Sequence, residues 1–275
     1  MTESSLKGRN AFVTGGGSGI GLACARRFAI DGANVLVMGR NREKLAAATD
    51  EIRKAAPDVK VQFHVGDVGT EADVKAAVSE AALEGRLDIA VANAGTGALA
   101  PIMVTESDSW ETVMRTNLTG TFYTIKHAAA AMSSHGGAIC AISSIAGVRT
   151  HRFMGTYCVS KAGIDMLVRN CADELGVRGI RVNSVCPGLV DTEIAAGLMM
   201  TPEVHDDYLA CMPISRTGVV ADISNAVRFL CGDEASWITG VTLSVDGGHH
   251  LRRGPNVETF SRQIFGDDIT EGRLS

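Results

Sequence analysis

The stretch that decides the fold is Thr14-Gly15-Gly16-Gly17-Ser18-Gly19-Ile20-Gly21, which directly follows the apolar run Ala11-Phe12-Val13. Its glycines permit positive φ angles and let a pyrophosphate approach the backbone closely. The helical pattern that begins at Gly19 would direct free N–H groups and a favourable dipole at such phosphates. A glycine-rich turn alone is often an ordinary loop, but a turn between a strand and a helix predicts a dinucleotide site.

Short β-branched runs alternate with alanine-rich helical stretches along the rest of the chain. The expected strands are 11–13, 34–38, 61–65, 89–92, 138–142, 181–185 and 241–245, and the expected helices are 19–31, 43–56, one from 70, 105–132, 157–175 and 221–230. Thr70 with Asp73, and Thr105 with Asp108, match a capping box. This alternation predicts an α/β fold in which helices cover both faces of a doubly wound parallel sheet of seven strands.

Domain organisation follows from where this rhythm stops. Residues 1–248 contain no repeat or linker, so we expect one domain there. The connection at 191–213 is long and contains a short helical pattern, which is typical of a lid. Residues 249–275 form a polar C-terminal extension that either crosses a subunit interface or is partly mobile.

Composition excludes several classes of function. The net charge of −5 disfavours nucleic acid as a partner, and no apolar run is long enough to span a bilayer. The segment Met1–Asn10 has no apolar signal core, so we expect a cytoplasmic protein. The seven cysteines are scattered and odd in number, which predicts reduced core residues and no metal site. His249-His250 is interpreted as a pair of surface residues. Binding of a metal ion by that pair remains an alternative.

Candidate binding residues lie after the predicted strands, where open parallel sheets bind ligands. Arg40 follows the second strand where an NAD site would carry a carboxylate, so a 2′-phosphate and NADP are favoured over NAD. The alternative is that Arg40 and Arg42 begin the next helix in solvent. Asp67-Val68 is placed to meet the adenine, and Asn93-Ala94-Gly95 to line the cofactor floor, although each is also consistent with an ordinary turn.

Tyr157 and Lys161 carry the predicted chemistry. They are four residues apart and share one helix face. A free tyrosine has a pKa of about 10, and a neighbouring ammonium is expected to lower it so that the phenol exchanges protons near neutrality. Ser144 could hold the substrate oxygen. Asn117 is a poor residue for a helix interior, so we expect a local kink there and a water that passes protons from Lys161, against the alternative of an exposed helix position.

These motifs together resemble the short-chain dehydrogenase/reductase family, over roughly residues 6–248. The resemblance implies a single-domain Rossmann fold, a catalytic tetrad of Asn117, Ser144, Tyr157 and Lys161, and assembly into tetramers or dimers through the helices near 111–132 and 157–175. Lys161 would also hold the nicotinamide ribose. The family's usual Asn-Asn-Ala-Gly reads Ala92-Asn93-Ala94-Gly95 here. The expected cofactor contacts are Gly15, Gly17, Ser18, Gly19, Ile20, Gly21, Arg40, Asp67, Val68, Asn93, Ala94, Gly95, Tyr157, Lys161, Pro187, Gly188, Val190 and Thr192.

The leading hypothesis is an oxidoreductase that transfers hydride between NADP(H), or NAD(H), and a hydrophobic secondary alcohol or ketone. Expected pocket segments are 97–101, 148–154 and 198–212, with His151 and Arg152 interpreted as polar rim residues. A non-catalytic NADP-binding protein on the same fold is the alternative, and an epimerase or dehydratase of nucleotide sugars would need a larger sugar-binding region.

Overall fold

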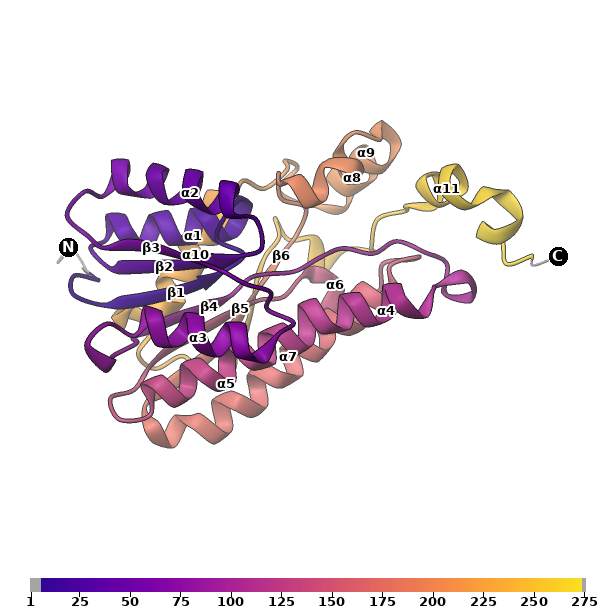
Figure 1. The fold of residues 1–275 in the computed structure, drawn as a ribbon. Helices are drawn as coiled ribbons and strands as arrows, with labels where there is room; N and C mark the ends of the chain where they lie inside the picture. Colours follow the sequence, from indigo (N-terminus) through magenta and orange to yellow (C-terminus); the bar gives the residue numbers. More distant parts are fainter. Residues whose placement is uncertain (1–5, 274–275) are drawn as a thin grey trace.

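A parallel sheet of seven strands forms the centre of this computed structural model, which describes residues 6–273 (Figure 1). The strands are β1 Asn10–Thr14, β2 Asn34–Gly39, β3 Val61–Val65, β4 Ile89–Ala92, β5 Gly137–Ile142, β6 Ile180–Pro187 and β7 Thr242–Val245. Their order in the sheet is β3-β2-β1-β4-β5-β6-β7. In the centre, Val13 of β1 pairs with Val37 on one side and Val91 on the other. The predicted doubly wound α/β fold is confirmed.

Helices cover both faces of the sheet. They are α1 Gly19–Ile30, α2 Arg42–Ala55, α3 Glu71–Ala81, α4 Ser107–Val113, α5 Gly120–Met132, α6 Ile145–Val148, α7 Gly155–Leu175, α8 Ala196–Met199, α9 Pro202–Cys211, α10 Val220–Cys231 and α11 Glu258–Thr270. Figure 1 shows α1 and α2 above the sheet and α3, α5 and α7 below it. Buried residues of α10 pack in the same apolar cluster as those of α1. Residues 1–5 and 274–275, which belong to the ends of the two expected segments 1–248 and 249–275, lie outside the described residues.

The strands are apolar on both faces because both faces are buried. Side chains alternate along β1, so that Val13 packs with α1 and α10 while its neighbour Phe12 packs with α3 and α5. Both side chains are completely buried. Five of the seven free cysteines are also buried, as expected for core residues; Cys158 and Cys171 are partly exposed.

The expected helix 105–132 is interrupted. Its two α-helical parts, α4 and α5, are joined by a π-helix at Met114–Thr119, and Asn117 lies inside that π-helix. The predicted local kink at Asn117 is therefore observed. A wider turn of this kind is rare and turns side chains away from their regular α-helical positions.

Both predicted capping boxes are wrong. Thr70 is the N-cap of α3 but makes no side-chain cap, because the Asp73 carboxylate accepts a hydrogen bond from the Asp67 N–H at 2.9 Å instead. In the second case the helix begins later, at Ser107, and the Thr105 hydroxyl donates to the Pro101 carbonyl at 3.1 Å. Each polar side chain has a tertiary or loop partner that the local spacing does not show.

A third apolar cluster joins the expected lid to the C-terminal extension. It is formed by Leu189, Val204, Tyr208, Met212 and Val257, with Phe260 packed against it. The extension carries an ordered helix, α11, which lies beyond the carboxyl ends of the strands in Figure 1. The polar sequence of this tail gave no prediction of a helix.

Candidate active site

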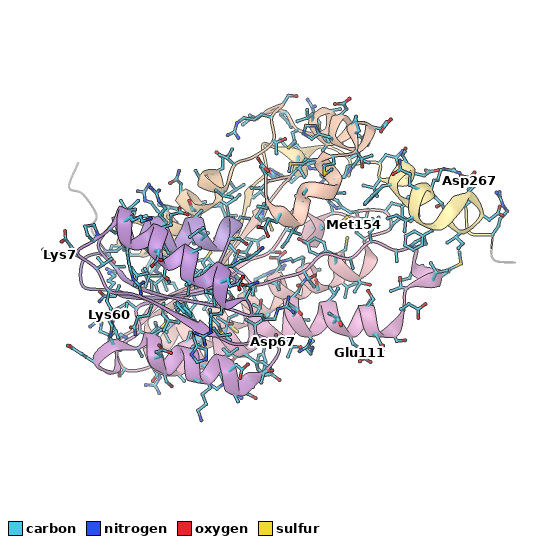
Figure 2. All side chains as sticks on the ribbon, turned by 45° about the horizontal axis from the view of Figure 1, so that its top comes forward. Lys7, Lys60, Asp67, Glu111, Met154 and Asp267 are labelled. Carbon is cyan, nitrogen blue, oxygen red and sulfur yellow. The ribbon has the colours of Figure 1, made fainter. Side chains whose placement is uncertain are left out.

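A cleft of about 710 Å³ lies at the carboxyl ends of the strands. Segments from all parts of the chain line it, from the glycine-rich turn to α11. Figure 2 labels two of its lining residues, Asp67 close to the sheet and Met154 on the side toward α11. The expected site residues that line it are Gly15, Ser18, Gly19, Ile20, Arg40, Asp67, Val68, Asn93, Ala94, Gly95, Ser144, Tyr157, Lys161, Pro187, Gly188, Val190 and Thr192. Gly17, Gly21 and Asn117 lie behind this surface.

The glycine-rich turn is tight enough to require glycine. Gly15 and Gly19 have φ angles of 66° and 54°, a region that other residues rarely adopt. A Cβ on Gly21 would lie 2.3 Å from the Gly15 carbonyl oxygen, so this glycine lets helix and strand pack closely. Gly17 has more room, because its nearest neighbour would be the Lys44 Cβ at 3.4 Å.

The N-terminus of α1 is suited to a phosphate group. Its N-cap, Ser18, has no side-chain cap hydrogen bond, and the first turn contains no acidic residue. The first N–H groups of a helix lack intrahelical partners, and the helix dipole favours negative charge there. Ser18, Gly19 and Ile20 all line the cleft. The residues present therefore fit the pyrophosphate of a dinucleotide.

Asn93 fastens the turn to the fourth strand. Its side-chain amide donates to the Thr14 and Gly15 carbonyls at 2.9 and 3.3 Å, while the Thr14 hydroxyl accepts from the Asn93 N–H at 2.9 Å. Asn93 thus supports the sheet at this point even though Ala92 occupies the preceding position. The Ala94 N–H donates a second hydrogen bond to the same Thr14 hydroxyl oxygen at 3.1 Å.

Arg40 and Arg42 have different surroundings. Arg40 is exposed, lines the cleft and makes no ion pair with any described residue. The Arg42 guanidinium lies 5.7 Å from the centre of the Phe63 ring, outside the cleft lining. Asp67 lines the cleft with its carboxylate already engaged, because it accepts from the Gly69 N–H at 2.8 Å and pairs with Arg115 at 3.3 Å. Arg40 is therefore available to bind an anionic group in this part of the cleft.

Tyr157, Lys161 and Ser144 meet in the middle of the cleft. Ser144 is the N-cap of α6, and its hydroxyl accepts from the Ala146 N–H at 3.1 Å. Burial raises the pKa of the Tyr157 phenol and the Ser144 hydroxyl opposes that rise, which places the two groups close together. The Lys161 ammonium donates to the Ile142 carbonyl at 2.8 Å and lies 5.6 Å from the centre of the Tyr157 ring. The expected trio is assembled around one point of the cleft.

The pKa values of this trio correct one expectation. Burial raises the pKa of Tyr157, and Ser144 only partly opposes it. The predicted lowering of the Tyr157 pKa by Lys161 is therefore wrong for this chain without a ligand, because desolvation of the phenolate is the larger effect. Burial also lowers the pKa of Lys161 to about 8, with Cys186 and Asp165 acting in the opposite direction.

Asn117 is fully buried and is not an exposed helix position. Its side-chain oxygen accepts from the Thr96 N–H at 2.8 Å, and its amide nitrogen donates to the Thr96 carbonyl at 3.0 Å and to the Ser160 hydroxyl at 3.1 Å. The π-helix thus ties the segment after β4 to α7, one residue before Lys161. This contact fixes the distance between the cleft floor and Lys161.

The segment after β6 closes the cleft opposite α1. Gly188 is required there because a Cβ would lie 3.0 Å from the Asp246 Cα. Val190 pairs with Gly218 in an isolated parallel bridge, and the Thr192 hydroxyl donates to the Val190 carbonyl at 3.3 Å. A Cβ on Gly19 would lie 3.5 Å from the Thr192 methyl, which shows how closely the two sides approach.

The far end of the cleft differs from the predicted rim. His151 is only 4% exposed and lines the cleft, so its interpretation as a rim residue is wrong. Arg152 points elsewhere and pairs with Glu258. His249 is completely buried, so the prediction of a surface pair is wrong for that residue; His250 bonds to the Asp246 carboxylate at 3.0 Å. The short sequence pattern did not show that α9 and the extension cover these rings.

Tyr208 and Phe260 also line the cleft and are not among the predicted site residues. Tyr208 lies on α9, within the expected pocket segment 198–212, and its apolar helical neighbours could have indicated an inward face. Phe260 lies on α11, and no sequence signal placed the tail against the cleft. Within residues 6–273, no group of three His, Cys, Asp or Glu side chains is arranged to hold a metal ion.

Comparison with known proteins accounts for this arrangement. A family model described as enoyl-(acyl carrier protein) reductase matches residues 15–250. The chain belongs to the short-chain dehydrogenase/reductase family. It is 36% identical over 249 residues to a 3-oxoacyl-[acyl-carrier-protein] reductase of Chlamydia muridarum, covering 90% of this chain and 99% of the relative. It is also 36% identical over 251 residues to a galactitol 2-dehydrogenase (L-tagatose-forming) of Cereibacter sphaeroides, covering 90% and 97%.

Solved structures of the short-chain dehydrogenase/reductase family superpose closely. A member from Mycobacterium ulcerans gives a TM-score of 0.95 at 39% identity and covers 98% of this chain and all of the other. A carveol dehydrogenase from Mycobacterium avium, solved in complex with NAD, gives 0.85 at 30% identity, over 90% of this chain and all of the other. The relatives are named as dehydrogenases and reductases, so this short-chain dehydrogenase/reductase is an oxidoreductase. They give no support to the non-catalytic alternative.

Proposed function

We propose that this oxidoreductase transfers hydride between NADP(H) and an uncharged, largely apolar secondary alcohol or ketone. The arrangement of Ser144, Tyr157 and Lys161 beside a cleft with a phosphate-binding helix end carries the proposal. Few other arrangements combine a buried ammonium with a phenol and a hydroxyl at one point of a dinucleotide cleft. The one-domain organisation and a lid at 191–213 are part of the same proposal.

Each member of the tetrad has a separate task in the proposed reaction. Pro187, Gly188, Val190 and Thr192 would hold the nicotinamide, which when bound would supply or accept hydride at the substrate carbon. Ser144 binds the substrate oxygen by a hydrogen bond, and Tyr157 gives that oxygen its proton during reduction or removes it during oxidation. Lys161 binds the nicotinamide ribose and stabilises negative charge on the Tyr157 oxygen. Asn117 positions Lys161 relative to the cleft floor, because it hydrogen-bonds both Thr96 and Ser160.

NADP is the proposed cofactor because Arg40 lines the cleft after β2 and makes no ion pair with any residue in the range 6–273. A guanidinium binds a phosphate by paired charge-assisted hydrogen bonds. An NAD site would place a carboxylate after β2 to accept from the ribose hydroxyl, and Gly39-Arg40-Asn41 has none. Gly15, Ser18, Gly19 and Ile20 would hold the pyrophosphate, and Pro187, Gly188, Val190 and Thr192 would hold the nicotinamide carboxamide.

The proposal includes a homo-oligomer, either a dimer or a tetramer, in the cytoplasm. Apolar side chains are exposed on the two helices expected at the interface: Phe122 on α5, and Val159 and Met166 on α7. Exposed apolar patches of this kind are typical of contact surfaces. Among residues 6–273, no helix is long and apolar enough to cross a membrane.

The test is a turnover screen followed at the absorbance of reduced nicotinamide, with both cofactors and a panel of neutral ketones and alcohols. We expect ketone-dependent oxidation of NADPH that is lost in Tyr157→Phe. Binding of NADPH without turnover of any ketone or alcohol would contradict the proposed function.

A further inference from the structure

Three aromatic rings from separate segments meet at the end of the cleft away from the glycine-rich turn. His151 comes from the loop after α6, Tyr208 from α9, and His249 from the short helix His249–Leu251. The ring centres are 6.4 Å apart for His151 and Tyr208, 6.1 Å for His151 and His249, and 5.8 Å for Tyr208 and His249. The proposed transfer of hydride and proton uses none of the three.

His151 presents a hydrogen-bond acceptor to the cleft. Its Nδ1 lies 3.3 Å from the Arg149 carbonyl, so this nitrogen carries the proton and Nε2 keeps its lone pair. No residue in the range 6–273 bonds to that Nε2, although the side chain is 96% buried and lines the cleft. Burial lowers the pKa of His151 to about 4, so the ring is neutral at pH 7.

Tyr208 presents a hydrogen-bond donor to the same space. The ring is 4% exposed and lines the cleft, and the described part of the chain supplies no partner for its hydroxyl. Tyr157 is among the groups that raise the pKa of Tyr208, which places the two phenols near one another. Among the described residues the buried side-chain polar atom without a partner is His249 Nδ1, so the Tyr208 hydroxyl is accessible and can be reached by a ligand or water.

His249 packs against the Tyr208 ring and does not itself line the cleft. Its Nε2 bonds to the Arg253 carbonyl at 3.1 Å, and its ring meets Tyr208 edge-on at an interplanar angle of 81°. The ring is fully buried. His249 is therefore a positioning residue for Tyr208.

We propose that His151 and Tyr208 form a subsite for a hydroxyl group of the substrate, so that hydroxy ketones and the corresponding diols are the preferred substrate class. A hydroxyl is the small group that accepts from the Tyr208 O–H and donates to His151 Nε2 at once. A ketone oxygen or a carboxylate cannot donate to His151. This inference rests on the proposed function and adds to it the identity of a second substrate group.

The rest of the subsite excludes charged substrates. The other lining residues from the loop at 149–154, α8, α9 and α11 are Met154, Gly197, Leu198 and Phe260. None carries a charge, so an anionic group would lose its water there without gaining a partner. The subsite therefore favours an uncharged hydroxyl beside an apolar body.

The test compares two ketones that differ by one hydroxyl: 1-hydroxy-1-phenylpropan-2-one and 1-phenylpropan-2-one. Binding to the NADPH-loaded enzyme is measured by ligand-observed NMR titration, and kcat/KM by NADPH oxidation. We expect the wild-type enzyme to prefer the hydroxy ketone at least 10-fold in both measurements, since a site built for a hydroxyl rejects the analogue that lacks it. Tyr208→Phe should reduce this preference to less than 3-fold.

Tyr123→Phe is the matched control, because it removes the same atom from a half-buried tyrosine on α5 outside the cleft lining. His151→Phe should reduce the preference as Tyr208→Phe does, and His151→Gln should restore part of it through the amide oxygen. Equal binding of both ketones to the wild-type enzyme, or an unchanged preference in Tyr208→Phe, would overturn the subsite. If binding discriminates but neither ketone is turned over, the subsite stands and the proposed function fails.

Discussion

The Lys161 ammonium lies 5.6 Å from the centre of the Tyr157 ring, one turn further along α7, and donates to the Ile142 carbonyl at the end of β5. Ser144, which opposes the burial-driven rise in the pKa of the same phenol, caps the helix that follows β5. One strand end therefore anchors both groups that flank the phenol. Displacing this strand end would disturb the proton donor and its neighbouring cation together.

Tyr157→Phe should abolish turnover without weakening cofactor binding. The phenol oxygen is the proposed proton donor, and loss of a general acid commonly costs about 10²- to 10⁴-fold in rate. Stopped-flow measurement of hydride transfer, with fluorescence titration of NADPH for affinity, separates the two effects. Normal turnover in this variant would remove Tyr157 from the mechanism.

The pH dependence should report Lys161. Its pKa is about 8 in the free enzyme, so the ammonium is charged below that pH and neutral above it. Because the cation stabilises charge on the Tyr157 oxygen, kcat/KM for ketone reduction should be constant below about pH 8 and fall above it. Tyr157, whose pKa is raised, stays protonated through this range. In Lys161→Arg the fall should disappear from whatever activity remains, because guanidinium does not titrate there; an identical fall in both proteins would assign it to another group.

Arg40→Asp should shift cofactor preference from NADP toward NAD. Removing a charge-assisted hydrogen bond costs about 1.5–3 kcal/mol, which corresponds to roughly 10- to 100-fold in relative kcat/KM. Arg42→Ser is the control, since Arg42 lies over the Phe63 ring and does not line the cleft. Equal shifts in the two variants, or none in Arg40→Asp, would leave NADP without support.

Gly21→Ala should destabilise the fold far more than Gly17→Ala. The new Cβ at Gly21 would lie 2.3 Å from the Gly15 carbonyl oxygen, whereas at Gly17 its nearest neighbour would be 3.4 Å away. Overpacking costs about 1–3 kcal/mol, and the backbone here has little freedom to move. The free energy of unfolding from urea titration measures both variants. Similar values for the two would show that the turn adapts.

Phe260→Ala should weaken the binding of bulky ketones and leave cofactor affinity unchanged. The side chain lines the cleft and packs on the cluster that contains Tyr208 and Val257. Since the ring is only partly buried, we expect KM for an aryl ketone to rise about 3- to 10-fold. Phe229→Ala, at an exposed position of α10 outside the cleft lining, is a control for general loss of an aromatic ring. A changed Kd for NADPH would place Phe260 in a different role.

The sequence predicted those parts of the site that follow a strand or a local spacing. A few neighbouring residues determine the glycine-rich turn, the positions after β2 to β6 and the Tyr157–Lys161 spacing. Their place relative to the sheet then follows from the order of the elements. The break at Asn117 was also predictable, because an amide inside a helix competes for backbone hydrogen bonds.

Features that depend on distant segments could not be predicted in the same way. His151 and His249 are polar residues next to Arg152 and His250, yet both are buried, with their rings against Tyr208 of α9. Asp73 looked like a capping residue, but its partner is the Asp67 N–H. The raised pKa of Tyr157 also depends on the surrounding fold, because desolvation by burial outweighs the opposing effect of Ser144.

Phe260 lies near the end of the chain, whereas the glycine-rich turn lies near its beginning, and both line one cleft. Substitutions confined to α11 are therefore expected to alter substrate choice while the residues proposed to hold the dinucleotide stay unchanged. Grafting this terminal helix between family members would be a direct way to exchange selectivity without rebuilding the catalytic machinery.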